Sequence, residues 1–174
     1  MNFNLSKKSL EISPSLTLDI TAKAKAMKAE GVDVISFGAG EPDFNTPKNI
    51  VEAGIEAIEQ GKTRYTPASG LIELKEAVCK KFKDDNNLSY LPENIIISSG
   101  AKHSIYNALM AITNPGDEII ISVPYWVSYP ELIKLAGGIP VYINTKEEND
   151  FKYTINDLNR VITDKTKAII LNSP

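Results

Sequence analysis

Apolar residues recur along this chain with two different spacings, and each spacing predicts one kind of element. Spacing of three to four residues predicts helices over about 16–30, 47–60, 101–113, 127–136 and 154–162, and a further helix that begins near residue 71. Short continuous apolar runs predict strands over 32–37, 95–98, 118–123, 139–143 and 167–172.

From residue 95 onward, predicted strands and helices alternate, and each strand contains a continuous apolar run. That order is typical of a parallel sheet with helices on both faces. We therefore expect a three-layer α/β fold with a mostly parallel sheet, preceded by an extended arm (residues 1–14) and a helix. Ligands of such sheets bind at the carboxyl ends of the strands. The loops 98–103, 124–126 and 172–174 are therefore expected to line one site.

The composition of the chain argues against several classes of function. The chain has 174 residues, 43% of them hydrophobic, which is enough for one core. Its net charge is −3, without a basic stripe for nucleic acid or a polybasic helix for a membrane surface. We see no signal peptide or membrane-spanning run and expect the cytoplasm. Cys79 and His103 are the only residues of their types, so neither an intrachain disulfide nor an ordinary zinc site is expected.

The last predicted strand stops at the start of a loop, without a cap, helix or tail after it. Domains seldom end in that way, so we expect a piece of a longer chain.

The turn after residue 97 carries the most readable chemistry. Small residues, Ser98-Ser99-Gly100-Ala101-Lys102, lead straight into a predicted helix. The first backbone N–H groups of a helix lack intrahelical acceptors, and the helix dipole adds partial positive charge, so this turn is suited to a phosphate group. Only the amide of Lys102 is needed for that role. The alternative is a plain helix cap by one of the serines, and the segment alone does not separate the two.

Three other residues are candidates with ordinary alternatives. Trp126 could stack on a planar ring held near the phosphate turn, or could be a core aromatic. The amide of Gly40 could bind a substrate carboxylate, or the glycine could simply form a turn. The hydroxyl of Tyr65 could donate to a phosphate, or the ring could pack on the surface.

Two further patterns are excluded. His103 and Ser104 are adjacent on a predicted helix and point about 100° apart, so they do not form a nucleophile–base pair. The glycines at 38 and 40 lack the third glycine and the helix of a dinucleotide-binding fingerprint.

Five segments, in this order and spacing, make the chain resemble the N-terminal part of the class I aminotransferases, in the aspartate aminotransferase group. The resemblance covers about residues 16–174. The segments are Gly40-Glu41-Pro42-Asp43-Phe44, Lys62-Thr63-Arg64-Tyr65-Thr66-Pro67-Ala68-Ser69-Gly70, Ser99-Gly100-Ala101-Lys102-His103, Asn114-Pro115-Gly116-Asp117-Glu118 and Pro124-Tyr125-Trp126-Val127-Ser128-Tyr129-Pro130.

The resemblance implies a fold-type I enzyme that uses pyridoxal 5′-phosphate (PLP), whose cofactor acts as an electron sink. It implies that Gly100, Ala101 and Lys102 hold the cofactor phosphate through backbone amides. Trp126 would stack on the pyridine ring and touch the substrate, and Gly40 would bind the substrate carboxylate. Tyr65 would reach the phosphate in the other subunit of a homodimer. The implied domains are a small-domain segment with the arm (1–45) and the first part of the PLP-binding large domain (46–174).

Three groups that the resemblance implies come later in the chains of that family. They are the Schiff-base lysine, the aspartate on the pyridine nitrogen and the arginine that clamps the α-carboxylate. We therefore assign no catalytic residue here and expect an amino acid:2-oxoacid aminotransferase for aspartate and 2-oxoglutarate that is inactive as this piece alone. The alternatives are a carbon–sulfur lyase, a prephenate, alanine or aromatic transaminase, or a non-catalytic binding module.

Overall fold

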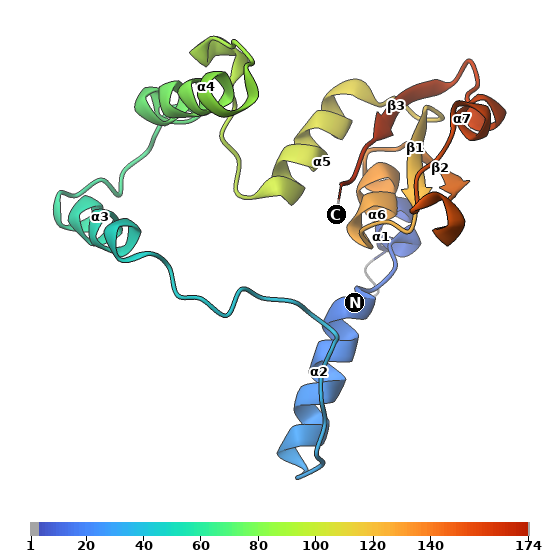
Figure 1. Cartoon of the computed structure of the whole chain (residues 1–174), viewed down its shortest axis with the longest axis horizontal. Coiled ribbons are helices and arrows are strands. Elements are labelled where there is room, and N and C mark those ends of the chain that lie inside the picture. The colour runs from blue at the N-terminus through green and yellow to red at the C-terminus, as the bar shows by residue number, and fades with distance from the viewer. Residues whose placement is uncertain (1–3, 174) are drawn as a thin grey trace. The chain divides into compact units, whose positions relative to one another are not determined.

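A computed structural model describes residues 4–173 and divides the chain into two compact units (Figure 1). The first unit contains the residues up to Ala39 together with those from Ala101 onward, and the second contains Gly40–Gly100. The helices of the described residues are α1 (Lys7–Glu11), α2 (Leu16–Ala29), α3 (Lys48–Glu59), α4 (Ile72–Asn86), α5 (Ala101–Ile112), α6 (Ser128–Leu135) and α7 (Ile155–Val161). The strands are β1 (Glu118–Val123), β2 (Ile139–Asn144) and β3 (Thr166–Ile170), and short 3₁₀ turns are η1 (Pro92–Asn94) and η2 (Glu147–Asn149).

The sheet of the first unit is parallel, with the order β2-β1-β3. Its central strand β1 contains three consecutive isoleucines, Ile119, Ile120 and Ile121, that are at most 1% exposed. A continuous β-branched run suits this position because both faces of a central parallel strand are covered. The carboxyl ends of all three strands therefore lie at one edge of the sheet.

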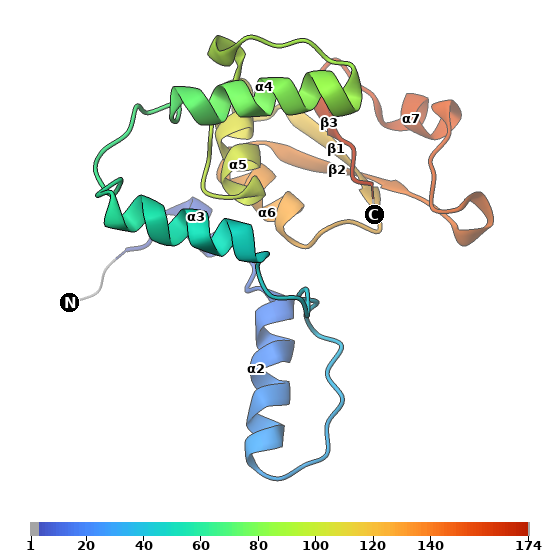
Figure 2. The same ribbon diagram turned by 60° about the vertical axis from the view of Figure 1, so that its left-hand side comes forward.

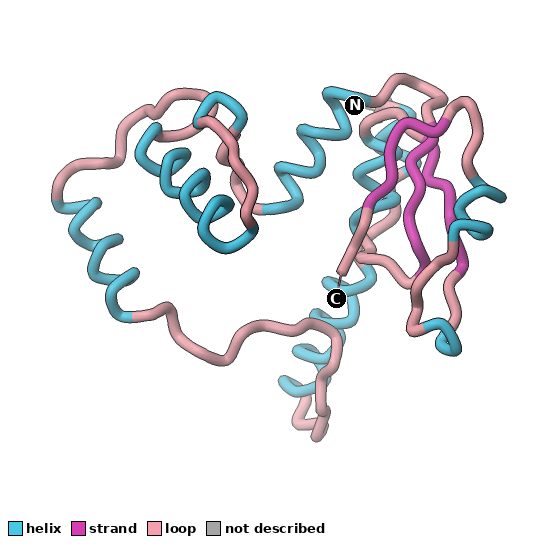
Figure 3. Tube along the Cα trace, turned by 45° about the horizontal axis from the view of Figure 1, so that its top comes forward, coloured by secondary structure: helices cyan, strands magenta, loops and turns pink. Residues whose placement is uncertain are grey.

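Helices lie on both sides of these strands. On one face, Leu109 of α5 and Ile133 of α6 pack against Ile119 and Ile121 in one buried cluster. Helix α7 contacts β2 and lies on the other side of the strands from α6 (Figure 3). The predicted α/β architecture with a parallel sheet is confirmed.

Two predicted strands are wrong. Residues 32–37 and 95–98 are extended or irregular and join no sheet. In the second segment, the N–H of Ile97 donates one backbone hydrogen bond to the Ser69 carbonyl (3.0 Å). A single hydrogen bond does not form the ladder of a strand pair. An apolar run indicates burial, but a strand also needs a neighbouring strand to accept its hydrogen bonds. The arm predicted as extended over residues 1–14 is also corrected, because it contains the short helix α1. The other predicted helices and strands are present, with ends that differ by a few residues, as at Lys48, the first residue of α3.

The second unit is built from α3, α4 and η1, and Figure 2 shows its two helices as separate rods joined by the segment between them. Helix α4 packs against η1, and the rings of Phe82 and Tyr90 meet edge to face at 5.6 Å. The buried Lys75 of α4 donates from Nζ to Ser69 Oγ at 3.1 Å. This unit contains residue 45, where the predicted domain boundary falls, and that boundary stays a prediction.

Candidate functional site

A cavity of about 490 Å³ opens at the carboxyl edge of the sheet. Three segments that are far apart in the sequence line it, namely the start of α5, the loop after β1 and the residue that follows β3 by two positions. These are the segments that the sequence placed at one strand edge. We call it the indole cavity, and it is lined by Ala101, Lys102, Ile105, Pro124, Tyr125, Trp126, Tyr129, Leu132 and Asn172.

The start of α5 supplies the polar side of the indole cavity. Ala101 and Lys102 are the first two residues of this 12-residue helix, so their N–H groups have no acceptor within it. Gly100, just before them, has φ +85° and open space where a Cβ would lie, so the left-handed turn favours glycine there. The N–H of Gly100 donates to the Ser98 carbonyl at 2.9 Å. In this conformation the free donors at the turn are therefore those of Ala101 and Lys102.

Trp126 supplies an aromatic face in the same cavity. Its side chain is 47% exposed, so it is not a core aromatic in this structure. The Lys102 ammonium nitrogen lies 5.7 Å from the centroid of the indole, within cation–π range. The structure thus brings Ala101, Lys102 and Trp126 to one cavity, which has a helix start for an anion and a flat face for a ring.

Two other residues line the cavity: Tyr129, to which the sequence assigned no role, and Asn172, which was expected only as part of the loop 172–174. The hydroxyl of Tyr129 donates to Asn172 Oδ1 at 2.7 Å and joins the first turn of α6 to the segment after β3. The backbone N–H of Tyr129 also donates to the Trp126 carbonyl at 3.0 Å. Tyr129 therefore holds the indole loop to the end of a neighbouring strand. The signal available in the sequence was that Asn172 follows a strand of the same sheet.

A second cavity of about 710 Å³ shares Lys102, Tyr125 and Leu132 with the first. We call it the arm cavity, because residues 13 and 14 of the N-terminal arm line it, as do Ser15, Leu16 and Asp19 at the start of α2. The rings of Tyr125 and Tyr142 are 5.5 Å apart in its wall. Burial, and then the neighbouring Tyr125, raise the pKa of Tyr142 above its usual value. Tyr142 is therefore uncharged at neutral pH.

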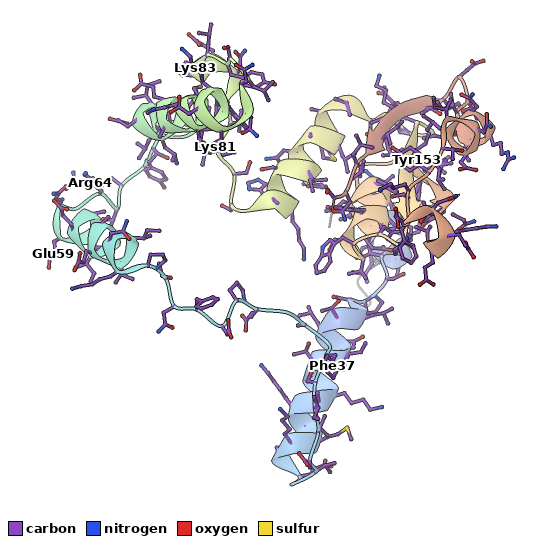
Figure 4. The ribbon with its side chains drawn as sticks, viewed as in Figure 1. Phe37, Glu59, Arg64, Lys81, Lys83 and Tyr153 are labelled. Carbon is purple, nitrogen blue, oxygen red and sulfur yellow. The ribbon has the colours of Figure 1, made fainter. Side chains whose placement is uncertain are left out.

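Gly40 and Tyr65 belong to the second unit. Open space surrounds Gly40, and its φ lies outside the left-handed region, so the backbone itself does not demand glycine there. The Tyr65 ring is fully exposed, and its neighbour Arg64 lies on the segment between α3 and α4 (Figure 4). The roles predicted for both residues stay predictions.

Residues 4–173 contain neither a metal-binding cluster nor a membrane-spanning helix. No group of three or more histidine, cysteine, aspartate or glutamate side chains in that range is placed to hold a metal ion. Within the same range, no helix has the length and apolar character to cross a membrane.

Comparison with known proteins decides the family. Residues 32–174 match the profile of the family described as aminotransferase class I and II. The chain belongs to this family.

Individual relatives agree. The chain is 59% identical over 163 residues to an aspartate aminotransferase of Bacillus sp. (strain YM-2), covering 94% of this chain and 42% of that protein. It is 50% identical over 163 residues to an aspartate/prephenate aminotransferase of Cereibacter sphaeroides, covering 94% and 41%. The structure of the Thermus thermophilus aspartate aminotransferase with maleate superposes with a TM-score of 0.95 at 43% identity, covering 99% of this chain and 45% of that one. The chain thus spans less than half the length of these relatives.

Proposed function

We propose that this chain supplies the phosphate-binding and ring-stacking part of a PLP-dependent aminotransferase site, in a protein that exchanges amino groups between aspartate and 2-oxoglutarate. The observation that carries the proposal is the indole cavity, where the start of α5 and the Trp126 ring line one space. Family membership supports the cofactor. PLP, when bound, supplies the electron sink for charge at the amino acid Cα.

The donor set of the indole cavity fits that cofactor. Amides at a helix start and the positive end of the helix dipole suit a phosphate dianion, and the proposed donors are those of Gly100, Ala101 and Lys102. The Gly100 amide would first have to leave the Ser98 carbonyl. The indole of Trp126 suits a planar pyridine ring and would also touch the substrate. The Tyr129–Asn172 hydrogen bond keeps the indole loop in place without using the indole itself.

We propose Gly40 as the amide that binds the substrate carboxylate and Tyr65 as a donor to the phosphate in a second copy of the chain. The full exposure of the Tyr65 ring supports a homodimer, because a large aromatic side chain at the surface of its own unit is available to a partner. Amino acid and 2-oxoacid substrates are proposed from the relatives' names. The single cysteine, which permits no intrachain disulfide, supports the cytoplasm as the compartment.

The proposed preference of the whole protein for dicarboxylate substrates, aspartate and 2-oxoglutarate, rests on two relatives. One is an aspartate aminotransferase, and the other is the Thermus aspartate aminotransferase, whose structure is that of the enzyme with maleate, a dicarboxylate. The aspartate/prephenate name of the Cereibacter relative supports a second candidate, amino transfer to prephenate. Assays of the whole protein with aspartate, alanine, aromatic amino acids and prephenate would separate these substrates. If a preparation that contains bound PLP transfers an amino group neither from any of these amino acids nor to prephenate, the proposal is contradicted.

Ala101→Pro tests the phosphate role directly. Proline is well tolerated at the first position of a helix, yet it lacks the N–H that would bind the phosphate. We expect the PLP dissociation constant of the whole protein to rise about tenfold, the size expected for one charge-assisted hydrogen bond. Ala101→Ser keeps the amide and is the matched control, with unchanged affinity. Equal PLP affinity for the two variants, at equal helix content by circular dichroism, would refute the assignment of this amide.

A further inference from the structure

The N-terminal arm is hydrogen-bonded to helix α6 at two points, Lys8 and Ser13. Lys8 Nζ donates to the carbonyl of Leu135, the last residue of α6, at 3.1 Å. The backbone N–H of Ser13 donates to Glu131 Oε2 at 3.0 Å. Helix α1 in the arm also packs against α6. Both hydrogen bonds join residues more than 100 positions apart, since the separations are 127 and 118 residues.

The Glu131 carboxylate is held on both of its oxygens. Lys134, one turn further along α6, pairs with Oε1 at 3.0 Å, while Oε2 receives the Ser13 amide. The side chains of Glu131 and Lys134 are only 21% and 32% exposed. An ion pair that is partly shielded from water is screened less than a fully exposed pair. Since each carboxylate oxygen has its own partner, the group has a fixed orientation toward the arm.

The hydrogen bond between Ser13 and Glu131 also restrains the start of α2, because only a short segment separates the two. Pro14 fixes its own φ and restricts Ser13 to extended conformations, and Ser15 is the N-cap of α2. Only two residues therefore separate the anchored amide from Leu16, the first residue of the helix. Residues 13–16 and Glu131 line the arm cavity together with Lys102 and Tyr125, and the last two also line the indole cavity.

From these contacts we propose that Glu131 is a positioning residue. It fixes Ser13 so that residues 13–16 form a wall of the space beside the indole cavity, where the side chain of the amino acid substrate would lie. The identity of what enters this space rests on the proposed function. The anchoring of the arm does not rest on it.

The test uses the whole protein and two measurements, hydrogen exchange in a peptide that covers residues 9–18 and steady-state kinetics with aspartate. Glu131→Ala removes the acceptor, and we expect exchange there to become about tenfold faster. The KM for aspartate should rise roughly three- to tenfold, while kcat stays within about twofold, because loss of a wall weakens binding in ground state and transition state alike. Glu131→Gln keeps an oxygen for the Ser13 amide and should give smaller changes in both measurements. Glu148→Ala removes an exposed carboxylate from η2 and is the matched control, with wild-type exchange and kinetics.

Three results would decide against the proposal. Unchanged exchange over 9–18 in Glu131→Ala would show that Glu131 does not hold the arm. Faster exchange with an unchanged KM would show that the arm is held but does not wall the substrate space. A fall in kcat at constant KM would place Glu131 in the chemical step instead. Absence of amino transfer in the wild-type protein would overturn the proposed function alone, because the exchange measurement would still decide whether Glu131 anchors the arm.

Discussion

The two compact units differ in how they bury their apolar residues. In the sheet unit, Ile119, Ile120 and Ile121 of β1 are almost completely covered by neighbouring strands and helices of the same unit. In the second unit, helix α3 has no buried residue, and its isoleucines are more than half exposed (Ile50, Ile55 and Ile58). The sheet unit thus closes a core with its own residues, whereas α3 presents an apolar surface.

An apolar pattern in the sequence does not by itself create a core. Both regions have apolar residues at the spacing of their element, but only β1 has neighbours on both faces. Burial of apolar area, rather than its presence in the sequence, provides the stabilisation. Stability measurements can therefore test the comparison residue by residue.

The largest expected effect comes from Ile121→Ala in β1. The side chain is 1% exposed, so truncation loses its burial and leaves a cavity that costs about 2–5 kcal/mol of unfolding free energy. Ile58→Ala in α3 is the matched control at 68% exposure and should change it by no more than about 0.5 kcal/mol. Urea unfolding and hydrogen exchange in peptides from β1 and α3 measure the change in unfolding free energy of both variants. Equal losses for the two variants would show that α3 is covered in solution and would break the comparison.

The sequence predicted most elements of the sheet unit for a physical reason. Its helices have apolar residues at helical spacing, and its three strands are continuous apolar runs between turn residues. The helix predicted over 154–162 begins with a capping box of Thr154 and Asp157. Such signals are local, so they can be detected in a single sequence. The segments 32–37 and 95–98 have the same apolar character but lack a pairing strand, and pairing is not encoded locally.

The features of the candidate site also fall into two groups, local features that the sequence could predict and long-range contacts that it could not. The helix start at Ala101 and Lys102 and the turn that carries Trp126 are local features, and the sequence pointed to both. The Tyr129–Asn172 hydrogen bond joins residues 43 positions apart and exists only because β3 pairs with β1. The anchoring of Ser13 by Glu131 likewise depends on how the arm lies on α6. Contacts of this kind follow from the fold and have no pattern of their own.

An intermediate effect is expected at Ser69 in the second unit. Lys75 is 9% exposed and donates to Ser69 Oγ, so Ser69→Ala leaves a buried ammonium group without this acceptor. We expect a loss of about 1.5 kcal/mol, the size of a hydrogen bond to a charged group. Lys75→Met removes the charge together with the donor and should cost less. Hydrogen exchange of α4 measures both variants, and a larger loss for Lys75→Met would mean that the lysine acts through another contact.

The smallest effect compares the helix starts of the two units. Thr154 Oγ1 accepts from the Asp157 amide at 3.2 Å, so Thr154→Ala should destabilise α7 by about 1 kcal/mol. In the other unit, the N-cap of α3 is Pro47, without a side-chain cap bond, and Thr46 precedes it. Thr46→Ala should therefore leave the stability of α3 unchanged. Exchange rates in peptides from α7 and α3 compare the two variants, and an equal loss at both would contradict the assigned caps.

Lowering the pH tests the Thr154 cap of α7 in a second way. Hydrogen bonds from the Thr154 backbone and hydroxyl lower the pKa of Asp157 below its ordinary value of 3.8. A carboxyl group whose pKa is lower in the folded state stabilises the fold above the unfolded pKa, and that stabilisation is lost as the pH falls through the folded pKa. The hydroxyl contributes to the shift, so the difference in α7 stability between the wild type and Thr154→Ala should be full near neutral pH and should shrink below about 3.8. A difference independent of pH would show that the Thr154 hydroxyl acts only through the Asp157 amide and not through its carboxylate.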